Sequence, residues 1–543
     1  MPVFVSAQTL RVRPPSLDAM TQSIKAYLVG SGIGSLAAAA FMIRDGNVPG
    51  DHITIFEADS VAGGALDGSG DPAKGYSLRG GRMLTTDNYE CTWDLFKTIP
   101  ALADASRTVF DETMAFNERH KSHAMARLVD QRRARVPVQS MGFSMQDRLE
   151  LLKLHKADES SMGASRITDW LSPAFFETEF WFMWVTTFAF QPWHSAVEFR
   201  RYLHRFVLEF SRIETLGGVK RTVFNQYDSL VRPLQAWLAQ QGVHVALGRA
   251  VTALDHRNAS DGRLVVTGIH TLQRGQAERI DVDETDLVIL QNGSMTDSSS
   301  LGSMTQAPTQ RVKVEGGGWT LWERLARDRP DFGNPKAFNT CIAQSCWESF
   351  TVTLQNPDFF AAIKDFSGNE AGTGGLVTFK DSNWLMSIVL AFQPHFIGQP
   401  ADVQVFWGYA LRPDRIGNFV PKSMAQCNGA EILQELCGHL RFDLETVASG
   451  NCIPCRMPYI TSMFMPRLPG ERPLPVPVSS KNLALVSQFV ELPEDVVFTV
   501  EYSVRAAQTA VYQLLQIDRE VPPVTPHDKS VRADLEALLK AFK

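Results

Sequence analysis

The sequence predicts an α/β protein in which one parallel-sheet domain is discontinuous and carries mainly helical and β-rich units as insertions. The first observation is a βαβ unit: the apolar run 26–29 leads into a glycine turn and an alanine-rich helix, and 53–56 forms a second strand that ends on Glu57. The second observation is a pair of apolar runs, 286–290 and 482–487, which are typical of strands returning to the same sheet. A chain of 543 residues is long enough for about two to four such units.

The glycine turn of the βαβ unit has the features of a dinucleotide site. Gly30, Gly32 and Gly34 allow backbone N–H groups to approach a pyrophosphate at the start of the helix, and Ser35 is small enough for close packing at the third fingerprint position. Glu57 ends the second strand, where it can accept hydrogen bonds from ribose hydroxyls. The alternative is a glycine turn in an α/β core without a ligand. The pair that follows Glu57 has the spacing of FAD-type Rossmann proteins and favours FAD over NAD; it consists of Gly63 and Gly64.

The insertions divide the FAD-binding domain into separate segments. Residues 140–215 are mainly helical in pattern, and residues 345–415 alternate apolar and polar side chains as strands do. We expect the substrate site to lie in these insertions. The expected division is an N-terminal extension (1–23), FAD-binding segments (24–110, 225–310 and 480–515), a mainly helical substrate-binding unit (111–224), a β-rich substrate-binding unit (311–479) and a C-terminal tail with a short amphipathic helix (516–543).

Composition excludes several classes of protein. Hydrophobic residues make up 44% and charged residues 21%, which is typical of a globular chain rather than a disordered or fibrous one. The net charge of -6 and the lack of a long basic run argue against a nucleic-acid partner. No uncharged apolar run reaches about 18 residues, so no transmembrane helix is expected.

The seven cysteines are scattered at low density, which argues against a disulfide framework and favours a reducing cytoplasm. Cys452 and Cys455 lack a second pair at zinc-site spacing, so we predict structural thiols and no metal. The amphipathic helix of the tail is expected to dock on its own protein first and to contact a membrane surface peripherally second. Its apolar positions are Val531, Leu535, Leu538, Leu539 and Phe542.

Long ordered motifs carry a resemblance from about residue 24 to residue 515. They include Arg79-Gly-Gly-Arg-Met83, Asn88-Tyr-Glu-Cys91, Trp93-Asp-Leu-Phe-Lys-Thr-Ile-Pro100, Thr187-Phe-Ala-Phe-Gln-Pro-Trp-His194, Phe199-Arg-Arg-Tyr202, Asn225-Gln-Tyr-Asp-Ser229, Asn292-Gly-Ser-Met-Thr-Asp-Ser298, Lys380-Asp-Ser-Asn-Trp384, Gln393-Pro-His395, Cys452-Ile-Pro-Cys455 and Phe498-Thr-Val-Glu-Tyr-Ser503. In these motifs the chain resembles the oleate hydratases, once called myosin-cross-reactive antigens. So many motifs in one order are far more specific than a glycine turn.

The resemblance implies hydration of the cis double bond of a long-chain unsaturated fatty acid, converting oleate to 10-hydroxystearate. It also implies that FAD is required without net redox change, with the reduced cofactor as the more active form. The flavin would then serve structure and electrostatics. Besides the glycine turn and Glu57, the cofactor contacts that the resemblance implies are Arg79, Gly80, Gly81, Arg82, Asn292, Phe498, Thr499 and Ser503.

The family pattern places the proton donor to the alkene at Tyr202. A tyrosine has an unperturbed pKa of about 10, so the site must also stabilise the developing carbocation. Many relatives carry a water-activating glutamate where this chain has Met83, which cannot act as a base. Asp87 and Glu90 are nearby in sequence and are candidate substitutes, although each alone is more often a solvated or structural carboxylate.

The head-group site also departs from the family pattern. The resemblance places Gln226 and His395 near the fatty-acid carboxylate, beside a threonine and an asparagine that appear here as Val389 and Ala391. Each hydrogen bond to a charged group contributes roughly 1.5–3 kcal/mol, so the loss of two partners weakens or re-aims recognition of the carboxylate. The substrate range is therefore expected to differ.

Three other functions fit parts of the sequence. Met83 is compatible with a fatty-acid double-bond isomerase that uses the same proton donor without water capture. The nucleotide-binding layout is shared with redox flavoenzymes such as amine oxidases or desaturases. A flavin-containing fatty-acid carrier would explain Met83, Val389 and Ala391 together. A monomer and a homodimer are both compatible with the sequence.

Overall fold

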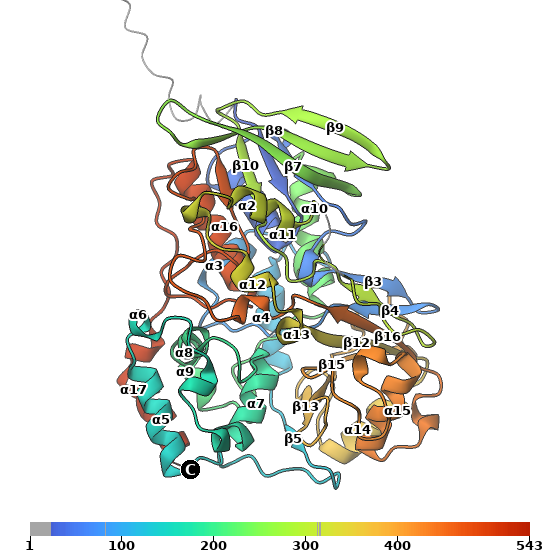
Figure 1. The fold of residues 1–543 in the computed structure, drawn as a ribbon. Helices are drawn as coiled ribbons and strands as arrows, with labels where there is room; N and C mark the ends of the chain where they lie inside the picture. Colours follow the sequence, from blue (N-terminus) through green and yellow to red (C-terminus); the bar gives the residue numbers. More distant parts are fainter. Residues whose placement is uncertain (1–22, 82, 312, 314–315, 543) are drawn as a thin grey trace, which may run out of the picture.

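The computed structural model describes residues 23–81, 83–311, 313 and 316–542. Arg82 and nearly all of the N-terminal extension 1–23 lie outside the described residues. In Figure 1 the chain forms an upper part built around a parallel sheet and a lower part in which helices and a second sheet lie next to each other.

The parallel sheet of the upper part has five strands in the order β17-β10-β1-β2-β6. β1, which begins the βαβ unit, is the central strand, and every neighbouring pair runs parallel. The strands are β1 (Ala26–Val29), β2 (Ile53–Phe56), β6 (His244–Ala246), β10 (Leu287–Leu290) and β17 (Leu483–Leu485). They come from three distant parts of the sequence, so the predicted α/β class with a discontinuous parallel-sheet domain is confirmed.

Helices cover this sheet and bury its apolar strands. α2 carries four consecutive alanines, all nearly inaccessible to solvent, and their small side chains permit the close contact that α2 makes with α16. α10 also contacts α2, and α3 contacts α16. These helices are α2 (Ile33–Arg44), α3 (Glu90–Phe96), α10 (Arg232–Gln240) and α16 (Val500–Leu514).

Smaller sheets and short helices extend the upper part. β7 to β9 form an antiparallel three-stranded sheet at the top of Figure 1, and β3 and β4 form a two-stranded hairpin. The strands are β3 (Gly68–Asp71), β4 (Gly75–Leu78), β7 (Arg249–Asn258), β8 (Leu264–Gln273) and β9 (Gln276–Asp281). The helices are α11 (Gly318–Leu325), α12 (Lys336–Asn339) and α13 (Ile342–Ser345).

The second sheet has seven strands in the order β11-β16-β12-β15-β14-β13-β5. Its strands are β5 (Leu128–Val129), β11 (Ser300–Leu301), β12 (Trp347–Leu354), β13 (Leu376–Phe379), β14 (Met386–Val389), β15 (Gln404–Ala410) and β16 (Asn451–Met457). α14 (Asp358–Ser367) and α15 (Gly429–Leu440) lie beside this sheet in Figure 1. β11 falls in the segment 225–310 that the sequence assigns to the FAD-binding domain, but the structure pairs it with β16.

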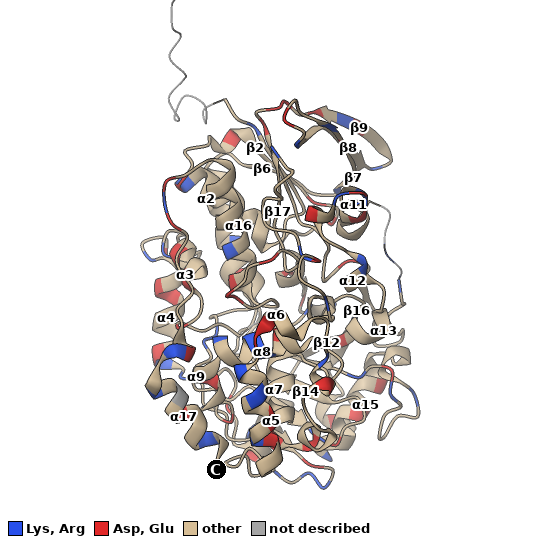
Figure 2. Ribbon diagram, turned by 60° about the vertical axis from the view of Figure 1, so that its left-hand side comes forward, with Lys and Arg blue, Asp and Glu red and all other residues tan. Residues whose placement is uncertain are grey.

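The helical part comprises α4 (Val109–Arg119), α5 (Met145–Lys156), α6 (Glu159–Met162), α7 (Glu179–Phe188), α8 (Ala196–Arg205) and α9 (Val207–Phe210). α8 and α9 are separated at Phe206, whose φ of -109° and ψ of 32° depart from helical values. The Phe206 ring stacks on Phe188 with centroids 5.0 Å apart. Figure 2 shows basic and acidic residues interspersed over these helices.

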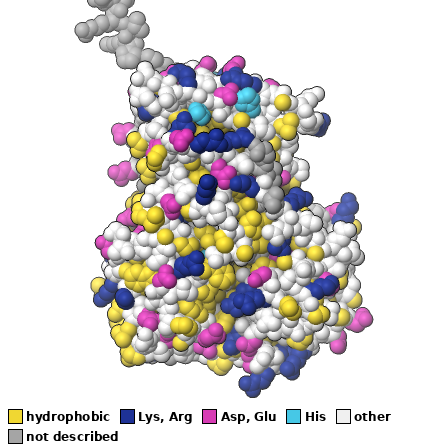
Figure 3. All heavy atoms as spheres, in the orientation of Figure 1, with side chains coloured by type: hydrophobic (Ala, Val, Ile, Leu, Met, Phe, Trp, Pro, Cys, Tyr) yellow, Lys and Arg dark blue, Asp and Glu magenta, His cyan; other side chains and the backbone are white. Residues whose placement is uncertain are grey.

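The C-terminal helix α17 (Val531–Ala541) packs against α9, as expected for a segment that docks on its own protein. Arg148 Nε of α5 donates a 2.8 Å hydrogen bond to the carbonyl of Ala541. Apolar side chains remain exposed on both helices, including Leu149, Leu152 and Leu538. Figure 3 shows hydrophobic side chains at the lower left of this face, where Figure 1 places α5 and α17. Within the described residues, no helix is both long and apolar enough to cross a membrane.

Candidate active site

A nucleotide-sized crevice begins at the carboxyl ends of β1, β2 and β10. Gly30 has a φ of 89°, and its N–H donates to the carbonyl of Phe56, which ties the start of the glycine turn to the end of β2. A Cβ on Gly32 would lie 2.6 Å from Oε1 of Gln291, and a Cβ on Gly64 would lie 3.4 Å from Cα of Gly32. These glycines therefore bring three chain segments into close approach, as a pyrophosphate site requires.

Glu57 lies at the edge of this crevice. Its Oε2 accepts hydrogen bonds from the backbone N–H of Ser31 at 2.9 Å and from the Ser31 hydroxyl at 2.5 Å. Its Oε1 accepts from the N–H of Asp59. These bonds hold the carboxylate at the end of β2, which is the position of the ribose-binding acidic residue in dinucleotide-binding folds.

Several other residues that the sequence predicts for the cofactor site surround the crevice, on α2, on the loop after β2 and at the start of α16. Gly34, Gly63, Gly64, Phe498, Thr499 and Ser503 line it together. Asn292 follows β10 and is fully buried, and its Oδ1 accepts from the Ser487 hydroxyl at 3.0 Å. Ser35 is buried behind the turn, where its hydroxyl accepts from Nε2 of Gln291.

The glycine-arginine segment lies beside Trp407. A Cβ on Gly81 would lie 2.3 Å from the Trp407 ring, and Gly80 has a φ of 147°, so both positions require glycine. Arg79 makes two 2.9 Å hydrogen bonds to the carboxylate of Asp67. Burial raises the pKa of Asp67 and Arg79 partly offsets this, so Arg79 serves a salt bridge in this structure.

An apolar cavity adjoins the crevice, because Phe498 and Thr499 line both spaces. Its other walls come from the glycine-arginine segment, α7, α8, residues 213–226 and strands β14 and β15. Most of its lining is apolar or aromatic. Such a cavity matches a long hydrocarbon chain better than a polar substrate.

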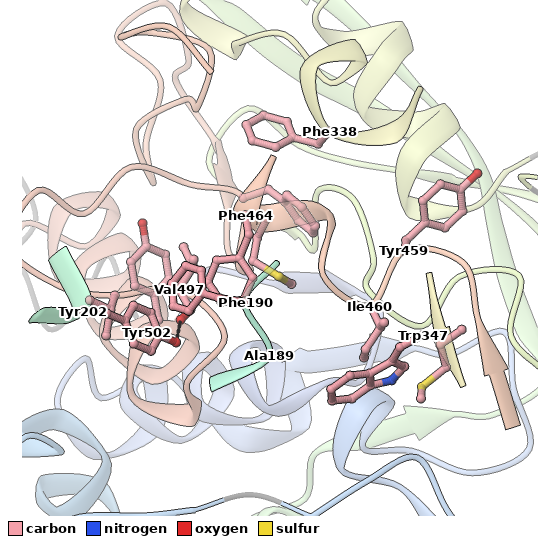
Figure 4. Packing of buried hydrophobic residues seen from close by; sticks show 14 of the residues in the cluster. Ala189, Phe190, Tyr202, Phe338, Trp347, Tyr459, Ile460, Phe464, Val497 and Tyr502 are labelled. Atoms are coloured by element: carbon pink, nitrogen blue, oxygen red, sulfur yellow. Dashed lines mark hydrogen bonds between the residues drawn. The ribbon is translucent and has the colours of Figure 1, made fainter. Parts of the chain in front are cut away.

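Tyr202 lies on the wall of this cavity and is 1% exposed. Its hydroxyl donates a 2.5 Å hydrogen bond to the carbonyl of Val497, directly before the segment shared with the crevice. Phe190 and Phe464 pack edge-on against the Tyr202 ring (Figure 4). The neighbouring Tyr502 donates instead to the carbonyl of Val490. The predicted proton donor thus donates a short hydrogen bond and lies within an aromatic cluster.

Three described positions are candidates for water activation, Met83, Asp87 and Glu90, and only Met83 lines the cavity. Met83 lines it, but Asp87 does not: its side chain is 37% exposed and pairs with Arg212 at 3.1 Å. Glu90 also lies outside the lining and pairs with Arg205 at 2.6 Å. Burial raises the pKa of Glu90, but the hydrogen bond and charge of Arg205 have the larger combined effect and lower the pKa to about 2. The structure therefore does not bring Asp87 or Glu90 to the substrate, because arginines hold both elsewhere.

The four head-group positions do lie together. Gln226, His395, Val389 and Ala391 all line the cavity, although residue 226 precedes the other three by more than 160 positions. Burial lowers the pKa of His395 to about 4, with a smaller contribution from the charge of Arg221. The imidazole is consequently neutral at pH 7 and offers hydrogen bonds without a positive charge.

The lining also contains polar residues that the sequence does not identify, among them Glu209, Arg221 and Tyr409. None of these three belongs to a recognisable motif. Leu84 and Lys220 exchange backbone hydrogen bonds, which sets the Met83 segment beside residues 219–221. The sequence signal for Glu209 is its spacing of seven residues from Tyr202, which is two turns of a continuous helix, although the structure places the two residues on α9 and α8, on either side of Phe206.

The cysteines are separate thiols. Cys452 and Cys455 lie in β16 and are buried, and burial raises the pKa of Cys455 to about 12. In the described part of the chain, no group of three or more His, Cys, Asp or Glu side chains is arranged to hold a metal ion.

Comparison with known proteins gives matches over almost the entire chain. The model of the MCRA family matches residues 23–512. An oleate hydratase of Streptococcus pyogenes serotype M49 (strain NZ131) is 38% identical over 530 residues, covering 95% of this chain and 89% of the relative. A linoleate hydratase of Lactiplantibacillus plantarum is 32% identical over 564 residues, covering 95% and 98%.

The fold also resembles that of solved structures. Cyclohexylamine oxidase from Brevibacterium oxydans IH-35A aligns with a TM-score of 0.51 at 11% sequence identity, covering 91% of this chain and 99% of that one. At this identity the likeness concerns the fold alone. It agrees with the parallel sheet and glycine turn described above.

Proposed function

Because the chain belongs to the MCRA family, we propose that it hydrates the cis double bond of a long-chain unsaturated fatty acid, forming 10-hydroxystearate from oleate with FAD bound. One observation carries the proposal: Tyr202 lines an apolar cavity that adjoins a dinucleotide-type crevice. The named activities of the two curated relatives support it. We further propose that the chain represents a variant form of the family, with Arg-Gly-Gly-Arg-Met in place of Arg-Gly-Gly-Arg-Glu.

The crevice fits a dinucleotide cofactor. The glycine turn places the start of α2 at the crevice, where the first backbone N–H groups of a helix lack intrahelical partners and can bind a pyrophosphate. Glu57 at the end of β2 would accept hydrogen bonds from a ribose. The other residues proposed to hold the cofactor are Gly34, Ser35, Gly63, Gly64, Arg79, Gly80, Gly81, Arg82, Asn292, Phe498, Thr499 and Ser503. When bound, an electron-rich flavin supplies electrostatic stabilisation beside the cavity, without net redox, and we propose that the reduced form supports the higher activity.

In the proposed reaction Tyr202 protonates one alkene carbon, and the oxygen of a water molecule bonds to the other. The water then loses a proton, and the phenolate regains one, so that the sum is addition of one water molecule. A phenol is a weak acid for an alkene. Exclusion of bulk water by the apolar walls strengthens the electrostatic interactions that stabilise the cation.

Water activation requires a group other than Met83. Among the described residues that line the cavity, Glu209 is the one carboxylate, and its Oε1 is held by the guanidinium of Arg212 at 2.5 Å. We propose that Glu209 receives the proton of the attacking water. Asp87 remains the sequence-based alternative, and it shares the same arginine.

We also propose where the enzyme acts and in which oligomeric state. The exposed apolar residues of α5 and α17 support peripheral contact with a membrane that holds the fatty acid, in a cytoplasmic protein. A monomer and a homodimer are both compatible with this surface. Sedimentation velocity without vesicles distinguishes a monomer from a homodimer, and co-sedimentation with phosphatidylglycerol vesicles tests the membrane contact.

The test is mass spectrometry of oleate incubated in ¹⁸O-labelled water with FAD-loaded protein, reduced or oxidised. Labelled 10-hydroxystearate is expected from the native chain. Tyr202→Phe is expected to lose about 10²–10⁴-fold in rate, because it removes the proton donor. A shifted double bond without label would instead indicate an isomerase, and stoichiometric oxygen consumption would indicate a redox flavoenzyme.

A further inference from the structure

We propose that Arg221 binds the carboxylate of the substrate and selects free fatty acids over uncharged lipids of the same length. The inference rests on the proposed function for the identity of the ligand. It assigns a role to a residue outside every motif, in the region where Val389 and Ala391 offer no polar side chain.

Arg221 is held rigidly at the cavity. Its backbone N–H donates to Oδ1 of Asn117 at 2.9 Å, and its carbonyl accepts from Nδ2 of the same side chain at 2.7 Å. Asn117 is buried on α4, so this pair of bonds fixes the start of the Arg221 side chain. The bonds between Leu84 and Lys220 secure the neighbouring residue.

The guanidinium lies against the wall that carries the head-group positions. A Cβ on Gly375 would lie 3.1 Å from Nη2 of Arg221 and 3.2 Å from its Cζ, so glycine leaves room for the group. The carbonyl of Gly375 accepts from the N–H of Leu390, the residue between Val389 and Ala391. The charge of Arg221 also affects the pKa of His395. These contacts place a cation within the proposed carboxylate site.

Arg221 lacks a counter-charge in the described structure. Its Nε and Nη2 are buried and make no hydrogen bond, and no described carboxylate pairs with it. Burial lowers its pKa to about 10, and no acidic group opposes this. Arg127 is equally perturbed, but its guanidinium donates to the carbonyl of Ile213 and the hydroxyl of Thr187. A partly buried guanidinium whose Nε and Nη2 lack hydrogen-bond partners is suited to an anionic ligand.

The chemistry of the ligand follows from the donors. The planar fork of a guanidinium matches the two oxygens of a carboxylate. Among the described lining residues, Arg221 is the one arginine or lysine, and the buried His395 is neutral at pH 7. Glu209 does not neutralise it, because Glu209 pairs with Arg212. Arg221 therefore compensates for the polar partners absent at Val389 and Ala391.

The experiment measures binding of stearate and of 1-octadecanol to the FAD-loaded protein by displacement of a fluorescent fatty acid. Neither ligand has a double bond, so binding is independent of hydration. Arg221→Gln is expected to weaken stearate binding about 10–100-fold and to leave octadecanol binding unchanged. Arg221→Lys keeps the positive charge but not the planar guanidinium, so it is expected to lose less affinity for stearate than Arg221→Gln. Arg119→Gln, an exposed cation on α4, is the matched control with unchanged binding.

Two outcomes overturn the proposal. The first is that both Arg221 variants lose affinity equally for stearate and octadecanol, or lose bound flavin, or melt at a lower temperature. Each of these results would indicate a structural role for Arg221. The other is an unchanged KM for oleate in Arg221→Gln while the native chain forms 10-hydroxystearate, in which case hydration stands without this anchor. If the native chain binds stearate in an Arg221-dependent manner but forms no hydroxystearate, the anchor stands and hydration fails.

Discussion

At the scale of single residues, the same arginine holds two carboxylates in different surroundings. Arg212 pairs with Glu209 at 2.5 Å and with Asp87 at 3.1 Å. The Glu209 side chain is 4% exposed and lines the cavity, whereas the Asp87 side chain is 37% exposed and does not. A base must reach the proton that it removes, so position decides between two chemically equal groups.

We predict that Glu209→Gln lowers the rate of oleate hydration about 10²-fold, because the amide cannot accept the proton of water. Asp87→Asn is the matched variant, since it removes the other carboxylate on Arg212. Its rate is expected to stay within about twofold of the native value. Rates measured by gas chromatography of the product test both variants, and the reverse order of effects would restore Asp87 as the base.

At the scale of elements, an ion network holds α8 against the segment that contacts Tyr202. Arg205 at the end of α8 pairs with Glu90 of α3 at 2.6 Å and with Asp495 at 3.2 Å. Arg505 of α16 pairs with the same two carboxylates at 3.0 and 2.9 Å. Asp495 precedes by two residues the Val497 carbonyl that accepts from Tyr202. The network therefore links three helices to the position of the proposed proton donor.

We predict that Glu90→Gln destabilises the protein and removes part of its acid sensitivity. The pKa of Glu90 is lowered in the folded protein to about 2, so its stabilisation is present above the unfolded pKa of about 4.5 and is lost as the pH falls towards 2. After a discount for solvent screening, Glu90→Gln is expected to lower the free energy of unfolding at pH 7 by about 1–2 kcal/mol. Melting curves from pH 7 to pH 3 should converge for the native and variant proteins.

The control for this prediction is Glu118→Gln, an exposed carboxylate on α4. Its melting curves are expected to follow those of the native protein at every pH. A difference between native protein and Glu90→Gln that stays constant down to pH 3 would show that the ion pair does not supply the stabilisation.

At the scale of the whole molecule, one crevice joins distant parts of the chain. Its lining includes the α2 turn, residues after β10 and the start of α16, which are separated by more than 180 positions along the sequence. A ligand there contacts elements that pack only in the folded state. Binding to the folded chain alone raises stability in proportion to ligand excess over Kd.

We predict that FAD at about 100 times its Kd raises the unfolding free energy of the flavin-free protein by about 2.7 kcal/mol. Thermal melting followed by circular dichroism measures the shift, and NAD at the same concentration is the comparison. Gly32→Val is expected to abolish the shift, because its side chain would meet Gln291 in the turn. Equal stabilisation of Gly32→Val by FAD would contradict the assignment of the crevice.

Sequence alone predicted those parts of the protein that depend on local order. The glycine turn, α2, β2 and Glu57 lie within one short stretch, where hydrophobic periodicity and glycine spacing reflect backbone geometry directly. The motifs also assigned Tyr202 and the four head-group positions to one substrate site, and all of them line the cavity.

The tertiary structure decided which charged side chains reach the cavity. Asp87 and Glu90 were candidates from the sequence because they follow Met83 closely, but each pairs with an arginine and neither lines the cavity. It gave no reason to select Arg221, whose importance arises from its lack of a described counter-charge beside Gly375. The pairing and burial of a charge depend on side chains that meet only when remote segments pack, so local order determined the scaffold and long-range packing determined the chemistry of the site.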